Sequence, residues 1–252
     1  MTGVPAAEMF TGAGGTRLAL HRMGAGRPVV MLHGLFSSAH VNWIKFGTAA
    51  QLAAAGFECL MPDLRVHGQS DAPHDPAAYP ADVLVDDAKA LVAHLGLTEY
   101  DLVGFSLGAR TAARAVLAGL TPRRLVLSGM GLEGLAGWEG RRDFFLDVID
   151  RFDTIKHGDP AFAARAFLKT MGVDRVAARL LLGTMEDTAP EDLAAITVPT
   201  LVLCGVQDND NGSADRLAAA LPDAVRATIP GTHMSSVTQK EMGAELVRFL
   251  AG

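Results

Sequence analysis

Short apolar runs recur along the chain, and each is followed within two residues by glycine or proline. Within a run the apolar positions are nearly continuous and do not alternate with polar ones, which is typical of strands buried on both faces of a sheet. The runs lie at residues 29–32, 58–61, 100–103, 124–127, 200–204 and, less strongly, 224–229.

Segments with helical periodicity separate these runs, at residues 48–55, 80–95, 107–117 and 213–221, and another follows at 239–250. Alternating strands and helices predict parallel crossovers, and therefore an α/β fold with a mostly parallel, doubly wound sheet. Residues 17–22 alternate between apolar and polar side chains, so we expect an antiparallel edge strand there.

This rhythm breaks between residues 131 and 195, where the pattern is helical throughout. We expect residues 131–195 to form a helical cap, inserted before the penultimate strand and lying over the carboxyl ends of the strands. Residues 1–130 and 196–252 would then form the core domain. A pair of long crossover helices packed on the face of the sheet is the alternative.

Composition narrows the classes of partner. The 252 residues are 49% hydrophobic and 20% charged, as in globular proteins, and the net charge of −6 comes without any Lys/Arg run. We therefore expect a small-molecule substrate, with neither nucleic acid nor a membrane as partner. The two cysteines lie within apolar runs and residues 1–5 do not look like a signal peptide, so we expect a cytoplasmic protein. The oligomeric state is left open.

The sequence Gly104-Phe105-Ser106-Leu107-Gly108 stands between an expected strand and an expected helix. In the G-x-S-x-G pattern a strained turn lifts the serine hydroxyl above the sheet, and the glycines let strand and helix approach closely. In this context the pattern resembles the nucleophile elbow of the α/β-hydrolase superfamily, and the resemblance covers nearly the whole chain. It implies that Ser106 is a nucleophile.

A serine hydroxyl needs an adjacent base, and the base needs an anion to orient it. His233 follows the last expected strand and looks like the histidine of the family's Gly-x-His. Asp208 follows the run at 200–204 and resembles the acid of the family's Gly-x-x-Asp loop, so the resemblance implies a triad of Ser106, Asp208 and His233. Four histidines carry no motif and are expected to be solvated: His21, His74, His94 and His157.

Two other carboxylates compete for the place of the acid in this triad. Asp210 lies only two residues after Asp208 and competes with it, and Glu133 is a minor possibility. Asn209 stands where the family usually has a proline, so the register of the loop is open.

Two further loops follow expected strands. By resemblance, the loop that starts at His33-Gly34 supplies the Leu35 N–H to an oxyanion hole, paired with the Leu107 N–H. Two amides aimed at an oxyanion can lower a barrier by roughly 3 kcal/mol each. The segment from Asp63 to Ser70 resembles the family's Asp-x-Arg-Gly-His-Gly-x-Ser turn and is interpreted as scaffold, with Val66 in place of the common glycine.

Large side chains near these loops and in the cap are candidates for an apolar substrate pocket. They are Phe36, Trp43, Phe105, Trp138, Phe144 and Met234. A buried structural position is equally open for Trp43, and the cap aromatics could simply pack on one another.

The chain shows no metal-binding or phosphate-binding motif, so we expect neither a metal nor a cofactor. Ser106 argues against haloalkane dehalogenases and epoxide hydrolases, which have an aspartate at the elbow. The main expectation is a serine esterase that forms an acyl-Ser106 intermediate. A lactonase, a carbon–carbon-bond hydrolase and a cofactor-free perhydrolase share this triad. A ligand-binding sensor with a slow triad is the alternative from another class.

Overall fold

The computed structural model describes residues 7–252, so the expectation about residues 1–5 lies outside the described part. Within that part, no helix has both the length and the apolar character needed to cross a bilayer.

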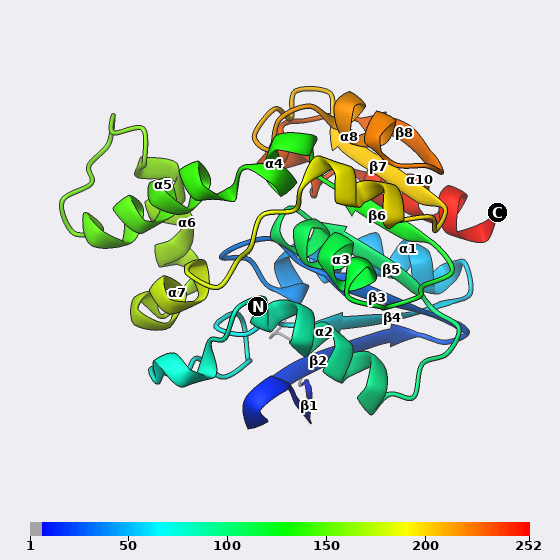
Figure 1. The fold of residues 1–252 in the computed structure, drawn as a ribbon, viewed down its shortest axis with the longest axis horizontal. Helices are drawn as coiled ribbons and strands as arrows, with labels where there is room; N and C mark the ends of the chain where they lie inside the picture. The colour runs from blue at the N-terminus through cyan, green and yellow to red at the C-terminus, as the bar shows by residue number, and fades with distance from the viewer. Residues whose placement is uncertain (1–6) are drawn as a thin grey trace.

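Eight strands form one sheet in the order β1-β2-β4-β3-β5-β6-β7-β8 (Figure 1). β1 and β2 pair antiparallel, and the other six strands are parallel to one another. The strands span Glu8–Thr11 (β1), Arg17–Gly24 (β2), Arg27–Leu32 (β3), Phe57–Pro62 (β4), Asp101–Phe105 (β5), Leu125–Ser128 (β6), Thr200–Gly205 (β7) and Ala224–Ile229 (β8). The predicted mostly parallel, doubly wound sheet is confirmed. β1 was not predicted, because only one of its four side chains is buried.

Each central strand sends side chains to two separate apolar layers. In β3, Val29 and Met31 join one buried cluster, whereas Val30 and Leu32 join the other. Both sets are fully buried, which explains why the strands read as continuous apolar runs.

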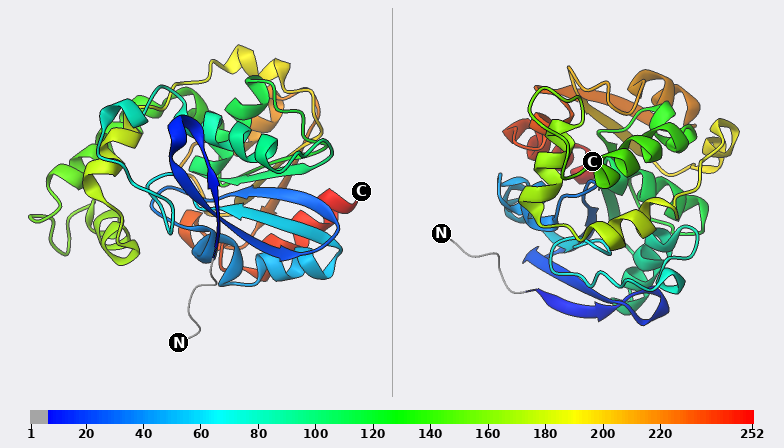
Figure 2. Two further views of the ribbon diagram at one scale, coloured as in Figure 1. Left: turned by 90° about the horizontal axis from the view of Figure 1, so that it is seen from below. Right: turned by 90° about the vertical axis from the view of Figure 1, so that its left-hand side faces the viewer.

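Helices cover both faces (Figures 1 and 2). α1 (Thr48–Ala54) and α10 (Lys240–Ala251) pack on the face that holds Val29. α2 (Val83–His94), α3 (Leu107–Leu117) and α8 (Ala214–Ala220) pack on the face that holds Val30.

The segment between β6 and β7 is helical, as the pattern indicates. It contains α4 (Leu132–Ala136), α5 (Trp138–Asp150), α6 (Phe162–Met171), α7 (Arg175–Leu182) and a 3₁₀ stretch at Pro190–Ala195. α5, α6 and α7 group at one end of the sheet rather than along a face (Figure 1). Val148, Ile155 and Ala161 form a small buried cluster of their own there. This arrangement favours a cap over crossover helices, and the domain limits at residues 131 and 195 stay a prediction.

Candidate active site

Ser106 stands at the turn between β5 and α3. Its φ of 52° and ψ of −113° lie in a region that non-glycine residues rarely adopt. A Cβ at Gly104 would overlap the backbone of Gly108, and one at Gly108 would overlap the carbonyl of Leu32. The two glycines therefore let β5, the turn and the neighbouring strand approach closely enough to hold the serine in this strained position.

His233 and Asp208 meet Ser106 because β5, β7 and β8 end at the same edge of the sheet. His233 Nε2 lies 3.0 Å from Ser106 Oγ. His233 Nδ1 lies 3.1 and 3.0 Å from the two carboxylate oxygens of Asp208. All three side chains are buried, each with less than a tenth of its residue surface exposed. The structure thus brings the three predicted residues into a single hydrogen-bonded row.

The loops that carry the base and the acid are locked together. Gln207 N donates to the Gly231 carbonyl at 3.0 Å, and a side chain at Gly205 would collide with that same carbonyl. His233 begins the short helix α9 (His233–Ser236), whose N-terminus is capped by the Thr232 side chain. Local backbone contacts therefore fix the imidazole beside the carboxylate.

The competing acids lie elsewhere. Asp210 is exposed, and its amide donates to Asp208 Oδ1 at 3.2 Å. Glu133 accepts a hydrogen bond from the Ser213 amide and pairs with Arg216. Neither carboxylate contacts His233, so the geometry favours Asp208.

The two amides expected for the oxyanion hole have no hydrogen-bond acceptor within residues 7–252. Leu107 N is the first amide of α3, where a helix leaves its N–H groups unpaired. Leu35 N lies in a loop whose next amide, that of Phe36, donates to His67 Nε2 at 3.0 Å. Neither amide is therefore committed to another acceptor in the described part of the chain.

This architecture is shared with known proteins. A family model described as alpha/beta hydrolase fold matches residues 27–130. A non-heme haloperoxidase of Rhodococcus erythropolis is 28% identical over an alignment of 280 positions, gaps included, which covers 95% of this chain and 98% of that protein. The esterase from Exiguobacterium antarcticum has a similar structure, with a TM-score of 0.80 at 19% identity and coverage of 98% of this chain and 100% of that one. The chain therefore has the α/β-hydrolase fold.

A third relative widens the range of chemistry. The 2-hydroxymuconate semialdehyde hydrolase of Pseudomonas sp. (strain CF600) is 33% identical over 166 residues, which are 65% of this chain and 54% of that protein.

The sequence interpretation missed a polar residue next to Ser106. Asn211 is buried, and its Nδ2 donates to the Gly129 carbonyl at 2.7 Å and lies 3.5 Å from Ser106 Oγ. The Asn/Asp/Gly composition of its turn hid it, since such residues usually serve turn geometry alone.

The predicted pocket residues lie in different surroundings. Phe36 and Phe105 are buried beside the site, and the Phe105 ring lies 5.0 Å from the His233 ring. Trp138 is buried in the cap, where its Nε1 donates to the Leu182 carbonyl at 3.3 Å.

The other predicted pocket residues lie at two extremes of exposure. Trp43 has no exposed surface and packs in the cluster beneath α1, so its expected contact with substrate is wrong. Phe144 and Met234 are 42% and 53% exposed.

The segment after β4 behaves as scaffold for the oxyanion loop. Leu64 N donates to His33 Nε2 at 2.9 Å, and His67 Nδ1 donates to the Arg65 carbonyl at 2.8 Å. Burial, followed by the neighbouring His33, lowers the pKa of His67 to about 3, so this imidazole is neutral and can accept the Phe36 amide.

Two other features of this scaffold concern the sequence expectations. His21 is buried 3.1 Å from Asp63, so its expected solvation was wrong. Val66, which replaces the common glycine, has a positive φ of 78°.

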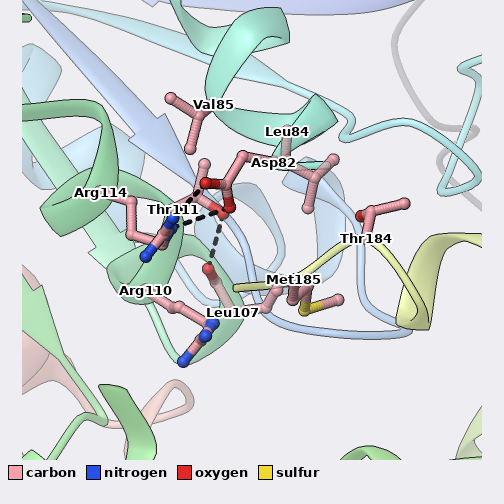
Figure 3. Close-up of a pocket in the computed structure, with 9 residues that line it drawn as sticks. All are labelled: Asp82, Leu84, Val85, Leu107, Arg110, Thr111, Arg114, Thr184 and Met185. Carbon is pink, nitrogen blue, oxygen red and sulfur yellow. Dashed lines mark hydrogen bonds and ion pairs between the residues drawn. The ribbon is translucent and has the colours of Figure 1, made fainter. Parts of the chain in front are cut away.

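α3 also anchors the cap segment. Arg114 forms an ion pair with Asp82, and both line a small cavity with Arg110 (Figure 3). Arg110 donates to the carbonyls of Gly134 and Leu135 at 2.9 Å, and burial lowers its pKa to about 10. The contacts of Arg110 tie the start of the cap segment to α3, the helix that follows Ser106.

Proposed function

We propose that this protein is a serine hydrolase that cleaves carboxylic esters through an acyl-Ser106 intermediate. The observation that carries the proposal is the 3.0 Å contact between His233 Nε2 and Ser106 Oγ, in a buried row that continues to Asp208. Nucleophile and base within hydrogen-bond reach, with the base held by an anion, are the arrangement that acyl transfer requires.

In the proposed first half-reaction, Ser106 Oγ attacks the ester carbonyl carbon while His233 Nε2 takes the hydroxyl proton. Asp208 stabilises the resulting imidazolium, and the Leu35 and Leu107 amides donate to the oxyanion. The carbon–oxygen bond to the alcohol then breaks, and His233 returns its proton to the departing oxygen. Water repeats the sequence on the acyl enzyme and releases the acid.

Relatives support a hydrolase but differ in the bond that they cleave. Their names include an esterase, a 2-hydroxymuconate semialdehyde hydrolase and a haloperoxidase. Ester hydrolysis asks least of the arrangement described, because perhydrolysis needs hydrogen peroxide as a further reactant and carbon–carbon-bond cleavage needs a stabilised carbanion as leaving group. Lactone hydrolysis, carbon–carbon-bond cleavage and perhydrolysis are the alternatives with the same three residues.

The test is a substrate panel with wild type beside Ser106→Ala. It contains p-nitrophenyl esters of short and long acids, lactones, dienone substrates, and acetate with hydrogen peroxide. We expect multiple turnovers on at least one ester, abolished in Ser106→Ala. Equal rates for both proteins on every substrate would refute the proposal, and a single turnover followed by arrest would favour the sensor.

A further inference from the structure

We propose that Arg141, on cap helix α5, binds a carboxylate of the substrate, so that the preferred esters carry a free acid group. The inference rests on the proposed function and names the substrate class for the same site. Two series of contacts fix the position of Arg141 near Ser106. The lack of a carboxylate partner for its charge indicates what kind of ligand it binds.

The first series of contacts runs through the acid loop. Arg141 Nη1 donates to the backbone carbonyl of Asp210. The side-chain nitrogen Nδ2 of the next residue, Asn211, lies 3.5 Å from Ser106 Oγ. Only one peptide link therefore separates the group that holds Arg141 from the residue beside the nucleophile.

The second series of contacts runs through the oxyanion loop. The Arg141 guanidinium carbon lies 5.8 Å from the centre of the Phe145 ring, one turn further along α5. That ring meets the Phe36 ring edge to face at 5.5 Å. Phe36 directly follows Leu35, whose amide is an expected oxyanion donor. Arg141 is thus held between the two loops that flank Ser106.

The charge of Arg141 has no carboxylate partner within ion-pair distance among residues 7–252. Four other arginines of the cap do have such partners: Arg142, Arg151, Arg175 and Arg179. Arg141 is also half-buried, and desolvation lowers its pKa despite the attraction of Asp210 and Asp208. A desolvated cation without a partner is costly in a folded protein, and an anionic ligand would offset that cost.

The chemistry of the side chain selects a carboxylate. A guanidinium carries five N–H donors in a planar fork that matches the two oxygens of a carboxylate. The Asp210 carbonyl uses only one of the terminal nitrogens. Asp208 is already directed at His233, so it does not neutralise Arg141. The remaining donors can therefore bind an acid group of a substrate that reaches Ser106.

The test uses matched pairs of esters in which the free carboxylate of one is a methyl ester in the other, and the release of the phenol from the shared ester is measured. On the alcohol side they are 3-acetoxybenzoate and methyl 3-acetoxybenzoate. On the acyl side they are phenyl hydrogen adipate and methyl phenyl adipate. In wild type we expect kcat/KM to be about 10- to 100-fold higher for the acid of at least one pair, mainly through KM, as for a hydrogen bond between charged groups. Arg141→Met should abolish that preference, so that the acid and the neutral ester of the pair have equal kcat/KM.

The control is Arg142→Met, the next residue on α5, whose charge is paired with Glu139 and Asp143. It should keep the preference for the acid. Equal use of acid and neutral ester by wild type would overturn the inference. An equal loss on both esters in Arg141→Met would overturn it too, because it would assign Arg141 only to holding the acid loop.

A binding measurement separates this inference from the proposed function. Calorimetry of Ser106→Ala with the same esters should detect tighter binding of the acid, lost when Arg141→Met is added. If wild type turns over neither these four esters nor any ester of the panel above, but this binding difference is found, the esterase proposal fails and the carboxylate site stands. If neither ester of either pair binds with a preference for the acid, the carboxylate site fails.

Discussion

Asp208→Asn is the sharpest test of the site, because it removes one charge without changing the size of the side chain. Both carboxylate oxygens lie about 3 Å from His233 Nδ1, and Asp208 is only 9% exposed. At an effective dielectric constant of about 20, a carboxylate and an imidazolium 3 Å apart attract each other by about 5 kcal/mol. In the proposed mechanism His233 becomes charged as it takes the proton of Ser106, so that attraction stabilises the transition state.

We therefore expect Asp208→Asn to lower kcat by about four orders of magnitude, the size also found for the same change in the serine-protease triad. The assay is kcat on a saturating p-nitrophenyl ester, with circular dichroism to verify the fold. Asp210→Asn is the matched control, because this exposed carboxylate contacts the site only through its backbone. It should change kcat by no more than about threefold. A larger loss in Asp210→Asn than in Asp208→Asn would show that the acid has been misassigned.

Three further predictions concern side chains around the triad. Asn211→Ala removes the side-chain amide that lies beside Ser106 Oγ, so kcat should fall about tenfold with KM nearly unchanged. An unaltered kcat would restrict Asn211 to a structural role. Val66 is buried at a positive φ, so the free energy of unfolding measured in urea should be about 1 kcal/mol larger for Val66→Gly than for Val66→Ala. Alanine loses similar burial but keeps the backbone strain. The opposite order would refute that strain. The folded-state pKa of His67 is about 3, below its unfolded value near 6.5, so the unfolded state binds the extra proton first and the free energy of unfolding should fall as pH drops from about 6.5 towards 3. Urea titrations between pH 7 and pH 4 should show a shallower pH dependence in His67→Gln, and an unchanged one would exclude His67 as a source.

The apolar runs predicted the sheet well, because a strand that is buried on both faces is apolar at nearly every position and can be recognised from its own residues. The helix of the nucleophile was expected at residues 107–117 and is observed at Leu107–Leu117. Ser106 and His233 were found for a related reason: each lies in a short pattern whose glycines are required by the local backbone. Such features depend on neighbours in the sequence and can be read from it.

The residues that were missed depend on contacts between distant segments. Asn211 approaches a serine 105 positions away, and Arg141 binds a carbonyl 69 positions away. His21 looked like a solvated residue because its partner, Asp63, belongs to another strand end. No periodicity or motif marks such pairs, and only the three-dimensional structure joins them.

The acid loop shows how a departure from the family pattern is accommodated. Asn209 replaces the proline that would stiffen the loop, and a freer loop would hold Asp208 less firmly. Here the loop is braced from outside, since Gly134 N donates to the Asn211 carbonyl at 2.9 Å and Ser213 N donates to Glu133 Oε2 at 2.7 Å. Both bracing residues belong to α4, the first helix of the cap segment. The position of Asp208 therefore depends on the cap as well as on the sheet, and for that reason the motif alone left its register open.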